Sequence, residues 1–307
     1  MKIGIMGAGG LGGYFGAHLA QAGHDVAFIA RGAQLSAMRE NGLRVISELG
    51  DAHLAHVTAT SDPATVGYVD CIIVAVKLWD TEEAVYAARP MIGQSTAIFS
   101  LQNGVEKDEI LARITGSDRV VGGVSYIAVK IASPGVIEQT GRMARAIVGE
   151  LNGERTERVT LLAQMLADAG IDTQVGDDIV RATWEKFVFL VGVAGITSLL
   201  RSDIGRIREN ANARSLLGEA MLEAVRVGLA AGVSLDPEFA QAQLSYCDTL
   251  PARMRASMAV DLERGRRLEL PWLNGAVVRL AGEFHVDAPV NGVIARALSI
   301  YANGTNT

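Results

Sequence analysis

The chain has 307 residues, which is more than a single hydrophobic core usually supports, so we expect two domains. Hydrophobic residues make up 49% of the sequence and charged residues 20%, a composition typical of soluble globular proteins and unlike that of disordered or fibrous chains. The formal net charge of -6 comes without a cluster of Lys and Arg, so we expect no nucleic-acid partner.

The cysteines and the start of the chain favour the cytoplasm. Cys71 and Cys247 lie far apart, without metal-ligand or redox-pair spacing, and are expected to be free thiols in a reducing compartment. The strand expected from Lys2 leaves no room for a secretory leader. The longest uncharged apolar run, 187–200, is too short to cross a bilayer, so we expect no membrane association.

The first 175 residues alternate strand-like runs with amphipathic segments, the pattern of a parallel sheet with crossover helices. Strands are expected over 2–6, 25–30, 70–76, 96–101, 120–128, 136–140, 144–148 and 172–175. Helices are expected over 14–22, 82–91 and 156–169. The sequence therefore predicts a doubly wound α/β domain over residues 1–175.

The strand signal fades after residue 176, and helical spacing dominates the rest of the chain. Helices are expected over 179–200, 208–231, 237–249 and 272–284. No Pro- or Ser-rich linker separates the halves, so the segment 176–178 is interpreted as a short hinge before an all-α C-terminal domain, 176–307. We expect the site to lie in a cleft between the two domains.

A glycine-rich turn follows the first expected strand and matches the pattern G-x-G-x-x-G. Gly7 can make the tight turn, Gly9 can let the backbone approach a pyrophosphate, and Gly12 can pack the helix closely on the strand. The helix N-terminus then faces the anion. The alternative is a glycine turn that binds nothing. We interpret the glycine-rich turn as a Rossmann-type dinucleotide site. Its residues are Gly7, Ala8, Gly9, Gly10, Leu11 and Gly12.

The end of the second expected strand indicates which dinucleotide is bound. NAD-preferring domains place Asp or Glu there to accept from the ribose hydroxyls. Here the strand ends with Ala30 and Arg31. A guanidinium suits the 2′-phosphate of NADP better than a bare ribose, so NADPH is the predicted cofactor. The alternative is an exposed loop arginine.

Two further residues lie where expected strands end. Lys77 follows the strand over 70–76, and Asn103 follows the strand over 96–101. The carboxyl ends of parallel strands form the edge where α/β sheets bind ligands. We therefore count both as candidate site residues. The alternative is that each is an ordinary turn residue, since Asn-Gly is also a common turn.

The helical half holds two ionisable residues in apolar surroundings. Lys186 lies at the apolar start of a helix, where partial burial would penalise its charged form and favour proton donation near neutral pH. Glu269 lies between Leu268 and Leu270, and a half-buried carboxylate needs a partner, either Lys186 or a substrate hydroxyl. The alternatives are a solvated lysine and, over 257–267, an ordinary charged helix face.

Together these segments resemble the ketopantoate reductase (2-dehydropantoate 2-reductase) family over nearly the whole chain. The matching motifs are the Gly7 to Gly12 loop with Arg31, Val76-Lys77, Gln102-Asn103-Gly104, Ser133-Pro134-Gly135-Val136-Ile137, Trp184-x-Lys186, Ser257-Met258-x-x-Asp261, and Glu269 before Asn274-Gly275. No single motif is decisive, but their joint order is specific.

The resemblance implies a cytoplasmic enzyme of pantothenate biosynthesis that uses NADPH to transfer hydride to the C2 carbonyl of a 2-oxo acid. By this resemblance Lys186 is the general acid, and Glu269 orients it or accepts from a substrate hydroxyl. Asn103 and Ser257 bind polar groups of the substrate, and Asn103 also borders the cofactor. Lys77 lies close to both cofactor and substrate.

The chain departs from the family on the helix of the lysine. Leu190 and Ala194 stand where the family usually has asparagines, and Leu268 replaces a common threonine. Each missing hydrogen bond would cost about 0.5 to 1.5 kcal/mol if a substrate group went unpaired. The alternative function is therefore reduction of a less hydroxylated 2-oxo acid than ketopantoate.

The sequence also bears on a regulatory role, a metal site and self-association. A non-catalytic NADP(H)-binding regulator would not need both Lys186 and Glu269. His53 and His56 have no accompanying ligands, so we expect surface residues and no metal. The apolar faces of the C-terminal helices leave a homodimer open.

Overall fold

The computed structural model describes residues 1–304 and divides the chain into two compact units. The first is Met1–Ile179, and the second begins at Val180. The domain boundary expected from the sequence, before Gly176, lies slightly earlier in the chain than the boundary between these two units. Ile179 belongs to the first unit because its side chain packs against the backbone at Gly122 and Gly149.

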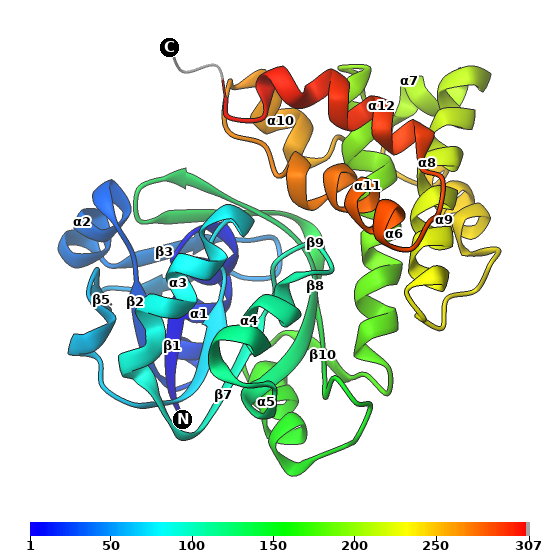
Figure 1. The fold of residues 1–307 in the computed structure, drawn as a ribbon. Helices are drawn as coiled ribbons and strands as arrows, with labels where there is room; N and C mark the ends of the chain where they lie inside the picture. Colours follow the sequence, from blue (N-terminus) through cyan, green and yellow to red (C-terminus); the bar gives the residue numbers. More distant parts are fainter. Residues whose placement is uncertain (305–307) are drawn as a thin grey trace. The chain divides into compact units, whose positions relative to one another are not determined.

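The first unit is built on a mixed sheet with a parallel core (Figure 1). Its strands are β1 (Lys2–Met6), β2 (Asp25–Ile29), β3 (Leu43–Ile46), β4 (Ala52–Leu54), β5 (Thr58–Thr60), β6 (Val69–Val74), β7 (Ile92–Ser100), β8 (Val120–Ser133), β9 (Val136–Gly149) and β10 (Asp172–Val175). Their order is β4-β3-β9-β8-β7-β6-β1-β2-β5, with β10 beside β9. All pairs from β5 to β8 are parallel, whereas β8 and β9 form a long antiparallel hairpin.

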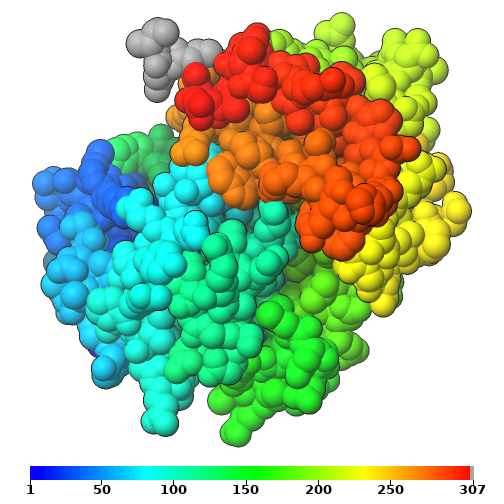
Figure 2. Space-filling model, in the orientation of Figure 1, coloured from blue at the N-terminus to red at the C-terminus, as the bar shows by residue number. Residues whose placement is uncertain are grey.

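Helices cover both faces of this sheet. They are α1 (Gly10–Gln21), α2 (Gly32–Asn41), α3 (Thr81–Ala88), α4 (Lys107–Thr115) and α5 (Glu157–Asp168). Strand β6 shows why the sheet needs a helix layer on each face, because its alternate side chains are buried on opposite sides. Cys71 and Ile73 join the core that includes residues of α1 and α5, while Ile72 and Val74 join the core beneath α3 and α4. The helices α3 and α4, cyan to green, lie over the sheet in Figure 1, and the cyan to green part of this unit forms much of its visible surface in Figure 2. The predicted doubly wound domain is confirmed.

Strand order indicates where this unit would bind a ligand. The parallel part runs β5-β2-β1-β6-β7-β8, so the direction of winding reverses between β1 and β6. In open α/β sheets such a reversal separates the loops at the carboxyl ends of two neighbouring strands and leaves a binding crevice. The loops that follow β1 and β6 are the glycine motif and Val76-Lys77.

The described residues of the second unit, 180–304, form helices joined by turns and loops, without a strand, and its first helix begins one residue earlier, at Ile179. Its helices are α6 (Ile179–Leu199), α7 (Ile204–Glu209), α8 (Ala211–Ala230), α9 (Phe239–Cys247), α10 (Ser257–Glu263), α11 (Asn274–Glu283) and α12 (Pro289–Leu298). The single helix expected over 208–231 is wrong at its start. Asn210 separates α7 from α8 and caps α8, since its Oδ1 accepts from the backbone N–H of Ala213 at 3.0 Å.

Two further observations concern the cysteines and the helices of the described residues. Both cysteines are free and buried, as expected. Burial raises the pKa of the Cys71 thiol, and it raises the pKa of Cys247 to about 12. Among the helices of residues 1–304, none combines the length and apolar character that a membrane span requires.

Candidate active site

The glycine loop has the geometry that dinucleotide binding requires. Gly7 has φ of +99°, and a Cβ there would lie 2.8 Å from the backbone nitrogen of Val76. A Cβ on Gly12 would lie 2.1 Å from the Gly7 carbonyl oxygen. At Gly9, by contrast, no described atom lies within 4 Å of the Cβ position. Gly7 and Gly12 thus serve the internal packing of the unit, while Gly9 leaves open space for a ligand.

Hydrogen bonds hold this loop in place from two sides. The N–H groups of Gly7 and Ala8 donate to the carbonyl of Ile29 at 3.1 and 3.2 Å. Gln34 Nε2 donates to the Ala8 carbonyl at 2.9 Å, and Gln34 Oε1 accepts from the N–H of Gly135 at 3.0 Å. Gly9 is the N-cap of α1 and provides no side chain to bond the first-turn N–H groups. These groups suit an anion such as a pyrophosphate.

Arg31 lies two residues after Ile29, the last residue of β2, at the same edge of the sheet, and it is the N-cap of α2. Its side chain is 66% exposed, and Nη2 lies 2.7 Å from Oε1 of Glu83, which is 65% exposed. Glu83 lies in the first turn of α3. The segment after β2, where an acidic ribose acceptor would lie, therefore carries an arginine, which is paired with a carboxylate from another element.

Gln102 joins the ends of β6 and β7. Its side chain is buried, and Nε2 donates to the carbonyl of Val76 at 2.6 Å and to Oγ1 of Thr81 at 2.9 Å. Gln102 Oε1 accepts from the hydroxyl of Ser100 at 2.8 Å. The bonds fix the backbone beside both candidate residues, because Lys77 follows Val76 and Asn103 follows Gln102.

Lys77 and Asn103 are therefore at the edge that the sequence predicted. Lys77 is exposed, and its Nζ lies 5.6 Å from the ring centroid of Trp79. Asn103 is half-buried. With the glycine loop and Arg31, they place four separate segments of the first unit at the carboxyl ends of neighbouring parallel strands.

Lys186 lies in the first half of α6 and is half-buried, as its apolar neighbours suggested. The flanking aromatic rings of Trp184 and Phe187 are buried and meet edge to face, with centroids 5.5 Å apart. Arg181 and Glu185, which directly precedes the lysine, form an ion pair of 2.8 Å along the same helix. The lysine is thus held on a well-packed helix.

Ser257 and Glu269 come from two other segments of the second unit. Ser257 is the first residue of α10 and is exposed. Glu269 is half-buried between the buried side chains of Leu268 and Leu270. Its backbone carbonyl accepts from the N–H of Trp272 at 3.0 Å, which fixes the turn that carries it. The expected half-buried carboxylate is present.

Leu190 and Ala194 are the two α6 positions that depart from the family pattern, and both are apolar. Buried asparagines lie nearby in the same unit. Leu190 is half-buried and Ala194 is 2% exposed. Nearby on the same helix, the carbonyl of Val191 accepts from Nδ2 of Asn274 at 3.1 Å. Asn274 Nδ2 also donates to Asn291 at 2.8 Å, which joins α6, α11 and α12. The amide groups of these asparagines are thus engaged in bonds that join the helices.

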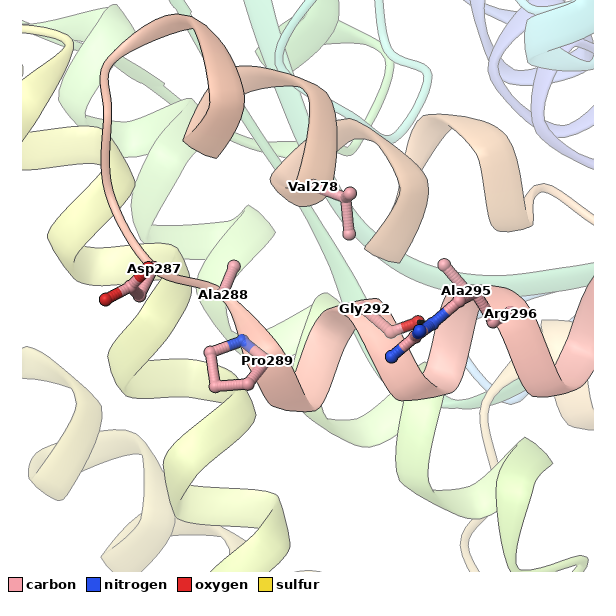
Figure 3. A pocket seen from close by; sticks show the side chains of 7 residues that line it. All are labelled: Val278, Asp287, Ala288, Pro289, Gly292, Ala295 and Arg296. Carbon is pink, nitrogen blue, oxygen red and sulfur yellow. Dashed lines mark hydrogen bonds between the residues drawn. The ribbon is translucent and has the colours of Figure 1, made fainter.

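A hollow in the second unit lies at α11 and α12 (Figure 3) and contains none of the three candidates Lys186, Ser257 and Glu269. The residues that line it are Val278, Asp287, Ala288, Pro289, Gly292, Ala295 and Arg296.

Within residues 1–304, no group of three His, Cys, Asp or Glu side chains could hold a metal ion.

Sequence reasoning missed the roles of Gln102, Gln34 and Glu83. Gln102 belonged to a recognised motif, and a glutamine directly after a buried strand is a usable signal for a loop tether. The other two residues lie on amphipathic helices, where a polar side chain is ordinarily solvated. Their partners, Gly135 and Arg31, are far away in the sequence.

Comparisons with known proteins agree with this architecture. The family model described as "Ketopantoate reductase PanE/ApbA" matches residues 3–153, and the model of its C-terminal domain matches residues 178–302. A 2-dehydropantoate 2-reductase from Mesorhizobium japonicum is 34% identical over 301 residues, covering 91% of each chain. An uncharacterised oxidoreductase, YkpB, from Bacillus subtilis is 28% identical over 98% of this chain and 99% of its own.

Solved structures give the same result. The crystal structure of 2-dehydropantoate 2-reductase from Geobacter metallireducens has a TM-score of 0.91 and 31% identity, covering 98% of this chain and 99% of that chain. Both units are therefore matched by one family, in sequence and in fold. The chain belongs to the ketopantoate reductase family and is an oxidoreductase that acts on a CH–OH group.

Proposed function

We propose that the protein uses NADPH to reduce a 2-oxo acid, with 2-dehydropantoate as the leading substrate and pantoate as its product. The observation that carries this proposal is the edge of the first unit, where an open glycine loop lies beside Arg31, Lys77 and Asn103. Relatives that cover most of the chain are named for this reaction.

The assignment of NADPH rests on how well the glycine loop and Arg31 suit the phosphate groups of that cofactor. The open space at Gly9 and the first-turn N–H groups of α1 suit the pyrophosphate of a nicotinamide dinucleotide. Arg31 stands where an NAD-binding domain would have a carboxylate, and its guanidinium suits a 2′-phosphate. Lys77 and Asn103 would border the cofactor at the next two strand ends. When bound, the reduced nicotinamide supplies a hydride.

We assign the proton to the second unit. Lys186 Nζ would donate it to the oxygen of the C2 carbonyl, so that hydride and proton together turn the C=O group into CH–OH. A positioned general acid contributes about 10²- to 10⁴-fold to a rate. Glu269 would orient the lysine or accept from a substrate hydroxyl, and Asn103 and Ser257 would bind polar groups of the substrate.

A second candidate substrate follows from α6. Leu190 is half-buried and Ala194 is buried, so neither offers a hydrogen bond at the positions where the family carries asparagines. A hydroxylated substrate would lose about 0.5 to 1.5 kcal/mol for each unpaired group. This observation favours a branched 2-oxo acid without the hydroxyl of ketopantoate. The buried free thiols fit work in the cytoplasm.

A panel of 2-oxo acids, assayed by the loss of NADPH absorbance, tests both candidates. We expect saturable turnover with at least one member and weaker turnover with NADH. A larger kcat/KM for ketopantoate than for unsubstituted branched acids would support the leading substrate, and the reverse order would support the alternative. Lack of turnover with every acid would contradict the proposed function.

A further inference from the structure

We infer that Glu83 is a selectivity-determining residue: it neutralises Arg31 and so limits how strongly the site prefers a 2′-phosphorylated cofactor. The inference rests on the proposed role of Arg31 as the 2′-phosphate ligand. The contact behind it is the 2.7 Å ion pair between these two side chains, which come from distant parts of the sequence.

The pair is formed by two anchored segments. Arg31 follows β2, whose last residue, Ile29, accepts hydrogen bonds from the glycine loop. Glu83 lies two residues after Thr81, the first residue of α3, whose hydroxyl accepts from buried Gln102. The backbone on each side is therefore fixed at the sheet edge, and the carboxylate is held within reach of the guanidinium.

A phosphate bound by Arg31 would meet the charge of Glu83. A guanidinium has several N–H donors, so Arg31 can bond a phosphate on one edge while Glu83 remains on another. The two anions would then lie about 5 Å apart in an exposed, screened setting. Their repulsion predicts that Glu83 weakens binding of a 2′-phosphate by about three- to tenfold. A ligand without that phosphate brings no charge to this position and is affected little.

The neighbouring residue provides a matched control. Glu82 lies in the same turn of α3 and is 53% exposed, but its Oε1 pairs with Nη2 of Arg113 on α4 at 2.7 Å. Glu82→Gln and Glu83→Gln therefore remove the same charge from adjacent positions with similar exposure. Only the second change removes a partner of Arg31.

Titration calorimetry with adenosine 2′,5′-bisphosphate and with 5′-AMP tests the inference without relying on turnover. For Glu83→Gln we expect three- to tenfold tighter binding of the bisphosphate and a change of less than twofold for 5′-AMP. Glu82→Gln should change both by less than twofold. Added salt should reduce the gain, because it screens exposed charges.

The Arg31→Gln variant distinguishes the inferred role of Glu83 from the proposed role of Arg31 as the 2′-phosphate ligand. If this variant loses affinity for the bisphosphate while Glu83→Gln behaves like Glu82→Gln, the inference fails and the role of Arg31 stands. Weaker bisphosphate binding in Glu83→Gln would also overturn the inference, because Glu83 would then support Arg31. If Arg31→Gln binds the bisphosphate like the unchanged protein, both the phosphate role and the inference are wrong.

Discussion

Adding one methyl group at Gly9 should separate cofactor binding from folding. No described atom lies within 4 Å of the Cβ position, and φ of -75° is ordinary for any residue. Gly9→Ala should therefore change stability by only about 0.5 kcal/mol, a small loss at an N-cap. The methyl group would occupy the space proposed for the pyrophosphate, so we expect NADPH affinity to fall by about tenfold or more, about 1.4 kcal/mol.

Gly12→Ala is the matched control for this change. Its Cβ would lie 2.1 Å from the carbonyl oxygen of Gly7, and backbone cannot move away cheaply. Overpacking of this kind costs about 1 to 3 kcal/mol, and each kcal/mol lowers Tm by about 2 to 4 °C in a domain of this size. Thermal melts and NADPH fluorescence titrations report the two effects. If Gly9→Ala binds NADPH like the unchanged protein, the loop does not hold the pyrophosphate.

Three further predictions concern single side chains. Lys186→Ala should lower kcat by about 100-fold or more with little change in NADPH affinity, and near-normal turnover would remove the lysine from the mechanism. Asn274→Ala, which removes a buried donor to Val191 and to a second asparagine, should cost about 2 to 4 kcal/mol in urea unfolding, and an unchanged midpoint would contradict the cross-link. Because burial raises the pKa of Cys71 and sets that of Cys247 at about 12, both thiols should stay protonated at pH 8 and react with a thiol reagent only after unfolding.

The sequence located elements whose signals are local. Strand β1 was expected with its observed bounds, because an apolar run ends directly at a glycine turn. The gap expected over 141–143 is a shift of register within one strand. Ile127 pairs with Ala144 and Val129 with Gln139, so β9 continues as one strand. Strands β3 to β5 were missed because each has only three or four residues, too few to show a period.

The same limit applies to the candidate site. Residues at strand ends, such as Lys77 and Asn103, could be found because parallel strands bring their carboxyl ends to one edge. Gln34 and Glu83 could not, because their importance lies in contacts with Gly135 and Arg31 that only the folded chain creates. Burial of Lys186 was predictable, since apolar residues surround it in the sequence as well as in α6.

The most direct test of the central claim is the stoichiometry of NADPH consumption and 2-hydroxy acid formation by the purified protein. We predict one 2-hydroxy acid for each NADPH oxidised, with 2-dehydropantoate or a less hydroxylated branched 2-oxo acid as substrate. In the same assay Lys186→Ala should bind NADPH but turn over about 100-fold more slowly. Tight NADPH binding without product from any 2-oxo acid would contradict the account and favour a non-catalytic NADP(H)-binding protein.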